Sequence, residues 1–411
     1  MLTAPKRPRS GILAITGGHV VPVADPPIEG GTVIVQDGRI TAVGPGHSLD
    51  VPQSARIIDA TGRWVLPGLV EAHSHLGVSE EGEAGDPINE ATEVNTARLR
   101  VLDGINPADP GFADALAGGV TTAVIMPGSA NPFGGQCAAV KCWGATVDEM
   151  VTQEPCGVKS ALGENPMRVH GGRGVLPATR FGTAAVIREA FGEADRYRAA
   201  RRRAGEEGSP LTASPTHEVL ARVLDGDLPL CQHVHRADDI ATALRLASEF
   251  GYRLVIHHGT EAHLLAGLIA EREVPVVCGP LTTGRSKVEL RNRTARAPGI
   301  LARAGVKIAI TTDHCEVPIQ YLALQAIIAV RDGLDPGTAL RAITLNPAQI
   351  LGLESRIGAL RPGLDGDIVI WSGDPLDVMS RPLHVFIEGR EVQRYDADTG
   401  ASVTLRPCQA G

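Results

Sequence analysis

The chain has 411 residues, of which 43% are hydrophobic and 21% are charged, so it can bury a large core and is not expected to be disordered. Its net charge of −8 argues against a general nucleic-acid-binding protein. Its seven cysteines are scattered and odd in number, which excludes a disulfide framework and indicates a reducing compartment.

The sequence also argues against a membrane protein. No stretch approaches the ~20 apolar residues of a membrane helix. The N-terminus carries basic residues but lacks the long apolar segment and the cleavage site of a secretion signal. We therefore expect a soluble, cytoplasmic protein that binds a small molecule, contacts neither membrane nor nucleic acid, and forms a homo-oligomer.

Residues 11–60 read as a small β module. Asp37-Gly38, between two runs of β-branched residues, is a strong hairpin signal. Glycine pairs mark other turns in this segment. The expected strands are Ile12–Thr16, His19–Val23, Thr32–Gln36 and Ile40–Val43.

From Val65 onward, apolar strand-like runs alternate with helical periodicity. Eight such strands over about 250 residues predict a (β/α)8 TIM barrel, with a doubly wound open sheet as the alternative. The expected strands are Val65–Val70, Val120–Met126, Cys137–Lys141, Gly157–Ala161, Pro229–His233, Arg253–His258, Val274–Cys278 and Lys307–Thr312.

One connection is much longer than the others. Residues 163–228 contain two expected helices, Thr183–Glu207 and Pro215–Leu224, and long insertions of this kind often form lids or substrate loops. β character returns at Asp367–Trp371 and His384–Ile387. We therefore predict a β-sandwich module built from residues 1–64 and 356–411, flanking a barrel of residues 65–355.

Ligand-type side chains stand at the ends of these strands. In a strand, residues i and i+2 share a face, so His73 and His75 can aim at one point, although two surface histidines are the alternative for this pair alone. The carboxyl ends of barrel strands form one mouth, where active sites lie. The other candidates are Lys159 with Glu164, His233 with His235, His257 with His258, and Asp313 with His314.

With these candidate ligands in this order along the chain, the sequence resembles the amidohydrolase superfamily, and within it the imidazolonepropionase-related amidohydrolases. The similar segments cover almost the whole chain. They are LPGLVEAHSH, VKSALGENP, HVHRADDI, VIHHGTEA, ITTDH and GALRPGLDGDIVIWSGDPL. The chain departs from this branch at His257, where a glutamate is common, and at Cys315, where proline is common. We expect Cys315 to be buried and inert, with a thiol that ligates a metal or reacts as the alternative.

The resemblance implies a metal centre with one or two divalent ions, zinc being expected and manganese or iron being alternatives. His73, His75 and Asp313 would hold the more buried ion. His233 and His258 would hold a second ion or assist a single one. Lys159 would bridge two ions if carboxylated, because a free ammonium has no acceptor atom. The alternative is a lysine that pairs with Glu164 or binds substrate.

The resemblance further implies hydrolysis of a C–N bond, an amide that is cyclic or N-acyl, by metal-activated water. Asp313 would accept the water proton and return it to the leaving nitrogen, and His258 or His235 would polarise the carbonyl. Basic groups at the mouth favour an anionic substrate. The candidate substrate-binding residues are Arg168, Arg173, His257 and Arg285. A heterocycle deaminase using the same site and a non-catalytic family member are the alternatives.

Overall fold

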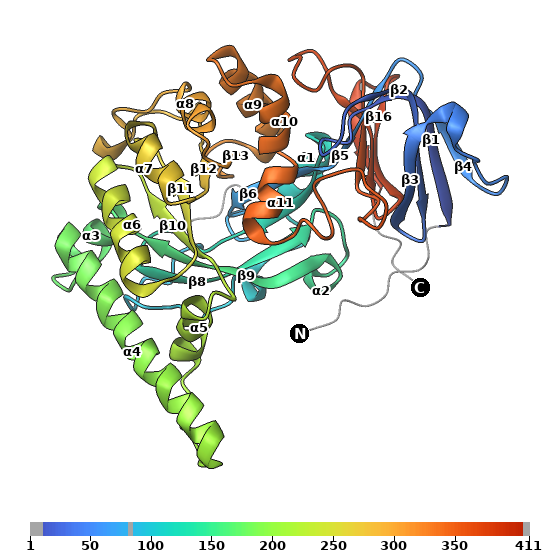
Figure 1. Cartoon of the computed structure of the whole chain (residues 1–411). Coiled ribbons are helices and arrows are strands. Elements are labelled where there is room, and N and C mark those ends of the chain that lie inside the picture. The colour runs from blue at the N-terminus through green and yellow to red at the C-terminus, as the bar shows by residue number, and fades with distance from the viewer. Residues whose placement is uncertain (1–10, 81–84, 406–411) are drawn as a thin grey trace.

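The computed structural model describes residues 11–80 and 85–405. The first ten residues of the N-terminal segment, in which no secretion signal was recognised, lie outside this range, as does Cys408. Two β-sheets organise the molecule (Figure 1). One forms the barrel in the middle of the chain. The other lies beside it and combines strands from both ends of the sequence.

The eight-stranded sheet is the barrel. Its two edges meet through a parallel bridge between Ser74 and His314, and the His75 amide donates to the His314 carbonyl at 2.8 Å. The strands follow one another in chain order around the sheet. They are β6 (Leu69–Ser74), β7 (Val120–Ile125), β8 (Phe133–Lys141), β9 (Val151–Ala161), β10 (Leu230–Val234), β11 (Leu254–His258), β12 (Val276–Cys278) and β13 (Ile308–Ile310).

Eight barrel strands were expected and eight are found, but one runs the other way. β8 is antiparallel to both β7 and β9, whereas a regular (β/α)8 barrel is all parallel. No crossover helix therefore separates β7 from β8. Because β8 is reversed, its beginning, Phe133–Gly135, lies beside Lys159 and Ser160 at the mouth.

The expected first strand, Val65–Val70, is in fact divided between the two sheets. β5 (Trp64–Pro67) pairs with β1 and β14 in the second sheet, and β6 begins at Leu69 in the barrel. Gly68 lies at the transition, where a Cβ atom would stand 2.0 Å from Oγ1 of Thr121. Only glycine permits this close approach of two strands.

Helices surround the barrel (Figure 1). Of the two helices expected in the insertion, Thr183–Glu207 is found as Arg180–Glu207, and Pro215–Leu224 is found at those residues. The helices are α1 (Gly111–Ala117), α2 (Val147–Met150), α3 (Glu164–Gly171), α4 (Arg180–Glu207), α5 (Pro215–Leu224), α6 (Ala237–Phe250), α7 (Ala266–Glu271), α8 (Ala297–Arg303), α9 (Leu322–Arg331), α10 (Pro336–Ala342) and α11 (Leu345–Leu351).

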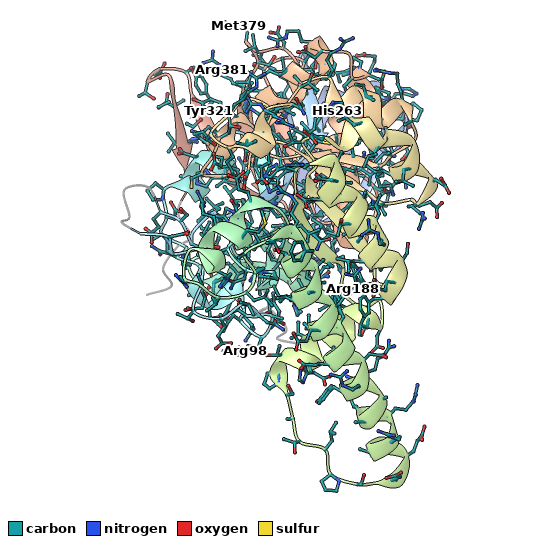
Figure 2. The ribbon with its side chains drawn as sticks, turned by 90° about the vertical axis from the view of Figure 1, so that its left-hand side faces the viewer. Arg98, Arg188, His263, Tyr321, Met379 and Arg381 are labelled. Carbon is teal, nitrogen blue, oxygen red and sulfur yellow. The ribbon has the colours of Figure 1, made fainter. Side chains whose placement is uncertain are left out.

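The insertion after β9 contains α3, α4 and α5. The hydroxyl of Thr179 caps α4 by accepting from the Gly182 amide at 3.0 Å, and Gly208 ends it with a φ of 66°. Figures 1 and 2 show that the outer part of α4, beyond Arg188, projects from the body. The outer part of this insertion therefore does not close over the barrel mouth as a lid would.

The second sheet has nine strands. β5 and β14 pair antiparallel and join the N-terminal strands to the C-terminal ones, as expected for a module built from both chain ends. The β-sandwich is not confirmed, because the strands form one continuous sheet. They are β1 (Ile12–Val20), β2 (Ile28–Gln36), β3 (Arg39–Pro45), β4 (Arg56–Asp59), β5, β14 (Ile368–Trp371), β15 (Pro382–Ile387), β16 (Arg390–Asp396) and β17 (Ala401–Thr404).

The predicted hairpin is confirmed. Gln36 pairs with Arg39, and the two residues between them have φ values of 51° and 85°, as a type I′ turn requires. The two runs expected before it, Ile12–Thr16 and His19–Val23, merge into the irregular strand β1. The domain boundaries proposed above stay a prediction.

The described residues contain no helix with the length and hydropathy needed to cross a membrane.

Candidate active site

The strand ends bring most of the predicted ligands together at the barrel mouth. His73 lies in β6, Lys159 in β9, His233 in β10 and His258 at the end of β11, and all four are buried. Asp313 follows β13. These residues are far apart in the sequence and meet because the strand ends converge.

One group of possible metal ligands consists of His73, His258 and Asp313, whose nearest ligand atoms all lie within 4.8 Å of one another. Nε2 of His73 is 3.5 Å from Oδ1 of Asp313, and Nδ1 of His258 is 3.8 Å from its Oδ2. His75 lies beside this group, with its Nε2 also 3.5 Å from Oδ1 of Asp313. Three imidazoles therefore face one carboxylate.

Backbone carbonyls orient two of these rings. Nδ1 of His75 donates to the Met126 carbonyl at 2.7 Å, and Nδ1 of His258 donates to the Gly279 carbonyl at 2.9 Å. Each Nε2 then keeps its lone pair in the neutral ring. A neutral His258 consequently has no N–H left for a substrate carbonyl, so its predicted role in polarising that carbonyl is not supported; it suits a cation better.

Burial keeps this site free of positive charge on histidine. Burial, followed by the charge of Lys159, lowers the pKa of His75 and of His258 to about 3, and lowers that of His73 well below its ordinary value. Burial raises the pKa of Asp313 to about 8, although Lys159 opposes the shift. Neutral imidazoles beside a desolvated carboxyl are suitable for binding a cation.

Lys159 is fully buried, and its Nζ lies 3.1 Å from Nε2 of His73. Burial lowers the pKa of this amine, although Asp313 opposes the shift. Among the described residues Lys159 and Glu164 form no ion pair, so the structure gives no support to that alternative. A buried amine with a lowered pKa has more of the neutral form that reacts with carbon dioxide.

A second group consists of His233, His235 and Glu289, again with ligand atoms within 4.8 Å of one another. The sequence analysis missed Glu289, which lies in the loop after β12 and is 1% exposed. A carboxylate in a loop carries no periodic signal, so only the tertiary structure reveals it. The His233 ring lies 4.5 Å from that of His258 and 4.6 Å from that of His235, centroid to centroid, so its expected pairing with His258 stays a prediction.

Glu71 is another buried carboxylate that the sequence analysis missed. It accepts from the Thr311 hydroxyl at 2.5 Å and from the Thr312 amide and hydroxyl at 2.9 and 2.6 Å. These bonds connect β6 to the end of β13, where the barrel closes, and so fix His73 relative to Asp313. Its spacing two residues before His73 on the same strand face was the available signal.

A small cavity opens above the two ligand groups. Its cationic residues are Lys287 and Arg293, and it is also lined by His233, His235, His258, Asp313 and Glu316. The predicted substrate-binding residues Arg168, Arg173 and Arg285 are exposed and do not line it. Their predicted role in substrate binding therefore gains no support from this cavity, because side chains in a long insertion and in loops have no register that sequence alone could fix.

His257 was also expected to bind substrate, but it is fully buried behind His73, with 2.8 Å between their Nδ1 atoms. Its position in β11 turns it into the barrel rather than toward the mouth.

The expectation that Cys315 is buried was wrong. Its thiol is exposed, with Sγ 3.3 Å from Oγ of Ser79.

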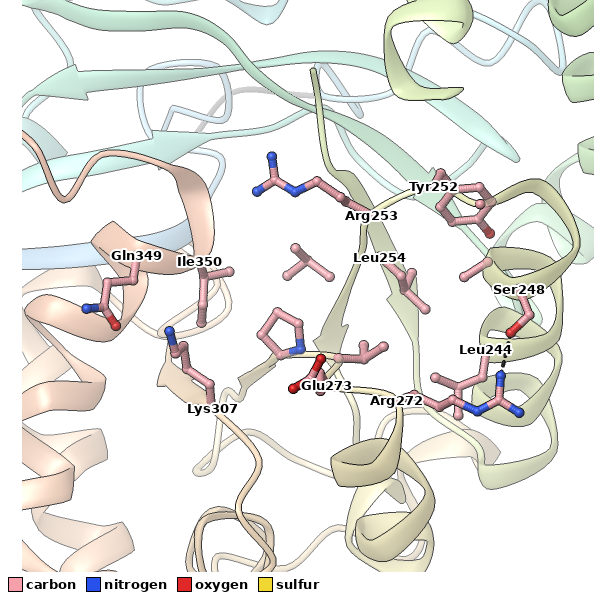
Figure 3. A pocket seen from close by; sticks show the side chains of 15 residues that line it. Leu244, Ser248, Tyr252, Arg253, Leu254, Arg272, Glu273, Lys307, Gln349 and Ile350 are labelled. Atoms are coloured by element: carbon pink, nitrogen blue, oxygen red, sulfur yellow. Dashed lines mark hydrogen bonds between the residues drawn. The ribbon is translucent and has the colours of Figure 1, made fainter. Parts of the chain in front are cut away.

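A larger cavity, of about 510 Å³, lies at the other end of the barrel (Figure 3). It is lined by residues at or before the beginnings of β11, β12 and β13, including Arg253, Glu273 and Lys307. It is far from the two histidine clusters, and active sites of such barrels lie at the carboxyl ends of the strands. We therefore place the chemistry at the smaller cavity.

The residues at the mouth fit a bound metal ion. Oδ1 of Asp313 and Nε2 of His235 are buried without a hydrogen-bond partner, which is costly unless another group satisfies them. A divalent cation would satisfy these lone pairs, and nitrogen and carboxylate ligands are those that zinc accepts.

Comparison with known proteins finds similarity to amidohydrolases. The model of the amidohydrolase family matches residues 199–392. A solved structure of an amidohydrolase from Thermotoga maritima is 44% identical, covers 93% of this chain and all of its own, and superimposes with a TM-score of 0.89. The amidohydrolase tasK of Hapsidospora irregularis is 32% identical over 87% of this chain, which spans only 39% of the length of that relative.

Two bacterial relatives are similar over most of their length. The imidazolonepropionase of Acidiphilium cryptum is 26% identical, with 85% of this chain and 89% of the relative aligned. The 5-methylthioadenosine/S-adenosylhomocysteine deaminase of Desulforudis audaxviator is 25% identical, with 87% and 84% aligned.

Proposed function

Because the chain belongs to the amidohydrolase family and is a hydrolase of carbon–nitrogen bonds, we propose that it cleaves an amide, cyclic or N-acyl, of a small anionic substrate. The observation that carries the proposal is the convergence of His73, His258 and Asp313 below a cavity lined by Lys287 and Arg293. The family names of the relatives favour an enzyme over a non-catalytic member.

We propose that His73, His258 and Asp313 hold a divalent transition metal, with His75 completing or supporting the site. The bound ion would supply Lewis acidity and a water of pKa about 7. Asp313, with one oxygen facing His73 and His75, is placed to accept the water proton and to return it to the leaving nitrogen. His235 faces the cavity and, with a proton on Nε2, could hydrogen-bond the substrate carbonyl.

The predicted carboxylation of Lys159 belongs to this proposal. Its burial and its distance of 3.1 Å from His73 support a neutral, reactive amine beside the ligand group. Carboxylation would give a carbamate that can bridge two ions. Lys159→Ala should then lose metal and activity, with partial rescue by short carboxylic acids, and a variant with unchanged metal content would refute the bridge.

The anionic character of the substrate rests on two side chains. Arg293 donates to the Thr283 hydroxyl at 2.6 Å and to the Gly284 carbonyl at 3.3 Å, and within residues 11–80 and 85–405 it makes no ion pair. Nζ of Lys287 pairs with Glu289 at 3.4 Å. An arginine in a cavity with neutral partners only can still bind a carboxylate through two parallel hydrogen bonds.

The experiment is a panel of cyclic and N-acyl amides, with and without a carboxylate, assayed with the metal-loaded protein. Arg293→Ala should raise KM for the anionic substrate far more than it lowers kcat, because the contact is equally strong in ground and transition state. Arg285→Ala, an exposed arginine outside the cavity, is the matched control. Equal turnover of charged and uncharged amides would refute the anionic substrate.

A heterocycle deaminase is the second candidate, favoured by the deaminase among the relatives. Water activated at the same metal site would attack a ring amidine in place of an amide. Release of ammonia from a purine, without ring opening or acyl transfer, would identify this chemistry.

A further inference from the structure

We propose that the seam between the barrel and the nine-stranded sheet contains a binding site for a small organic cation with an aromatic ring. The site is a cavity of about 440 Å³. Small-molecule sites are typically cavities of roughly 300–1,000 Å³ with mainly apolar walls, and they often lie between domains. This cavity shares no lining residue with the one at the barrel mouth, so the inference is independent of the proposed hydrolysis.

Both parts of the molecule supply the walls of this cavity. Leu340 comes from α10 of the barrel, Trp64 from β5, and Val21 from the residues that follow β1 (Figure 1). Leu376, in the loop after β14, adds another apolar side chain. A molecule bound here would therefore touch a barrel helix and the second sheet at once, through contacts that are mainly apolar.

Trp64 supplies the aromatic surface of the cavity. Its side chain is only half-buried, whereas that of Trp371, its partner on the neighbouring strand, is 2% exposed. The ring of His19 lies against Trp64, with centroids 4.2 Å apart, and Nδ1 of His19 pairs with Glu29 at 2.5 Å. Because Trp64 lines the cavity and is partly accessible, its indole can contact a ligand, and tryptophan is the side chain that attracts cations best through its ring face.

Two carboxylates on the cavity wall have no cationic partner. Asp335 and Asp374 line the cavity, and within residues 11–80 and 85–405 neither forms an ion pair. Oδ2 of Asp335 accepts from the Thr338 amide at 2.8 Å, and Oδ1 of Asp374 accepts from the Leu376 amide at 2.9 Å. These bonds fix both carboxylates but leave their charges uncompensated, which favours a ligand that combines a positive charge with an apolar ring.

The basic group of the cavity holds the wall in place. Among the lining residues that the structure describes, Arg341 is the only arginine or lysine, and it donates to the Val23 carbonyl at 3.2 Å. Val23 has a φ of 70°, which is rare for a β-branched residue and persists where the surroundings over-determine it, often at ligand sites. The remaining carboxylate, Asp25, pairs with Arg361 at 2.8 Å. The two uncompensated carboxylates therefore outnumber the single arginine.

The test measures how tightly 2-phenylethylamine, an aromatic ammonium, and its neutral analogue 2-phenylethanol bind to the metal-loaded, full-length protein. Titrations followed by saturation-transfer NMR give both dissociation constants. The amine should bind about tenfold more tightly than the alcohol, because only the amine carries a charge that the two carboxylates and the indole attract.

Asp374→Asn keeps an oxygen that can accept from the Leu376 amide but removes the charge. It should weaken binding of the amine by about threefold to fivefold and leave binding of the alcohol unchanged. Asp377→Asn is the matched control. Oδ1 of Asp377 accepts from the Met379 amide at 2.9 Å in the same loop, but Asp377 does not line the cavity, so this variant should bind both molecules as wild type does.

Trp64→Leu, with its fold checked by circular dichroism, locates the bound ring and should weaken binding of both molecules. Wild-type affinity for the amine in this variant would show that the amine binds elsewhere and would overturn the site. Equal affinities of amine and alcohol for wild type, or an unchanged affinity of Asp374→Asn for the amine, would overturn the preference for a cation. Absence of saturable binding of the amine in the millimolar range would overturn the proposal as a whole. If Trp64→Leu does not fold, the comparison of Asp374→Asn with Asp377→Asn decides.

Discussion

Asp313 is held in a conformation that L-residues rarely adopt, with a φ of 52°. Its amide donates to the Thr311 hydroxyl at 3.0 Å, and that hydroxyl also donates to Glu71. Strained backbone of this kind persists where the surroundings over-determine it, often at functional sites. The network aims the carboxylate at His73 and His75.

Asp313→Asn tests the role of this carboxylate. Asparagine keeps the size and one coordinating oxygen but cannot accept a proton, so the variant should fold, retain part of its metal and lose turnover. General acid–base catalysis contributes typically about 10²–10⁴-fold, so kcat should fall at least about a hundredfold. Steady-state kinetics together with metal analysis of the same samples provides the measurement. A folded, metal-loaded variant with a kcat within about tenfold of the wild-type value contradicts the assignment of Asp313 as the proton acceptor.

The pKa of Glu391, in β16, predicts how the free energy of unfolding depends on pH. Hydrogen bonds from His384 and Arg56 lower the pKa of this carboxyl from 4.5 to about 2, against the effect of burial. Because the folded pKa is the lower one, the stabilisation is complete above pH 4.5 and is lost as the pH falls toward 2. Urea unfolding across this range should give a flatter pH profile for Glu391→Gln; parallel profiles for variant and wild type would exclude the contribution.

At the scale of elements, an aromatic cluster fastens the long helix α4 to the barrel. Phe191 is fully buried, with its ring centroid 5.2 Å from that of Phe133 in β8 and 5.0 Å from that of Tyr252 before β11. Because its outer part projects from the body, α4 depends on contacts of its inner turns for its position (Figure 2).

Phe191→Ala should therefore lower the free energy of unfolding by about 3–5 kcal/mol, the usual cost of deleting a buried phenylalanine. Phe181→Ala is the control on the same helix, because Phe181 is 80% exposed and its loss should change stability by less than about 0.5 kcal/mol. Chemical denaturation measures both, and equal effects of the two substitutions would show that the cluster does not anchor α4.

At the scale of the whole molecule, a buried ion cluster connects the barrel to the nine-stranded sheet. Nζ of Lys141, at the end of β8, lies 2.9 Å from Asp365 and also pairs with Asp367, both just before β14. Burial opposes the charge of this lysine, but Asp367 and Asp365 outweigh it and raise its pKa. Arg39 and Arg356 also pair with Asp365.

Lys141→Met should be strongly destabilising, by about 3–5 kcal/mol, because it leaves Asp367 buried without its counter-ion. Lys307→Met, at an exposed lysine, is the matched control and should have little effect. Urea denaturation followed by fluorescence and by circular dichroism provides the measurement. A loss of stability no larger than that of the control would mean that the two sheets are held together by other contacts.

The sequence alone predicted the eight barrel strands, the Asp37-Gly38 hairpin, the two helices of the insertion and the family, and it named His73, His75, His233, His258 and Asp313 as a ligand set that stays a prediction. These features depend on local periodicity, turn chemistry and motif order, which the sequence carries directly. The homo-oligomer, the compartment and the domain boundaries stay predictions.

Only the tertiary structure decided the reversed direction of β8, the change of sheet at Gly68, the burial of His257 and the partners Glu71 and Glu289. It also showed that Lys287 and Arg293 line the cavity, whereas Arg168, Arg173 and Arg285 are exposed and do not. The physical reason is that strand direction and loop side-chain positions depend on contacts between residues distant in the sequence, whereas periodicity reports only which face of an element is buried.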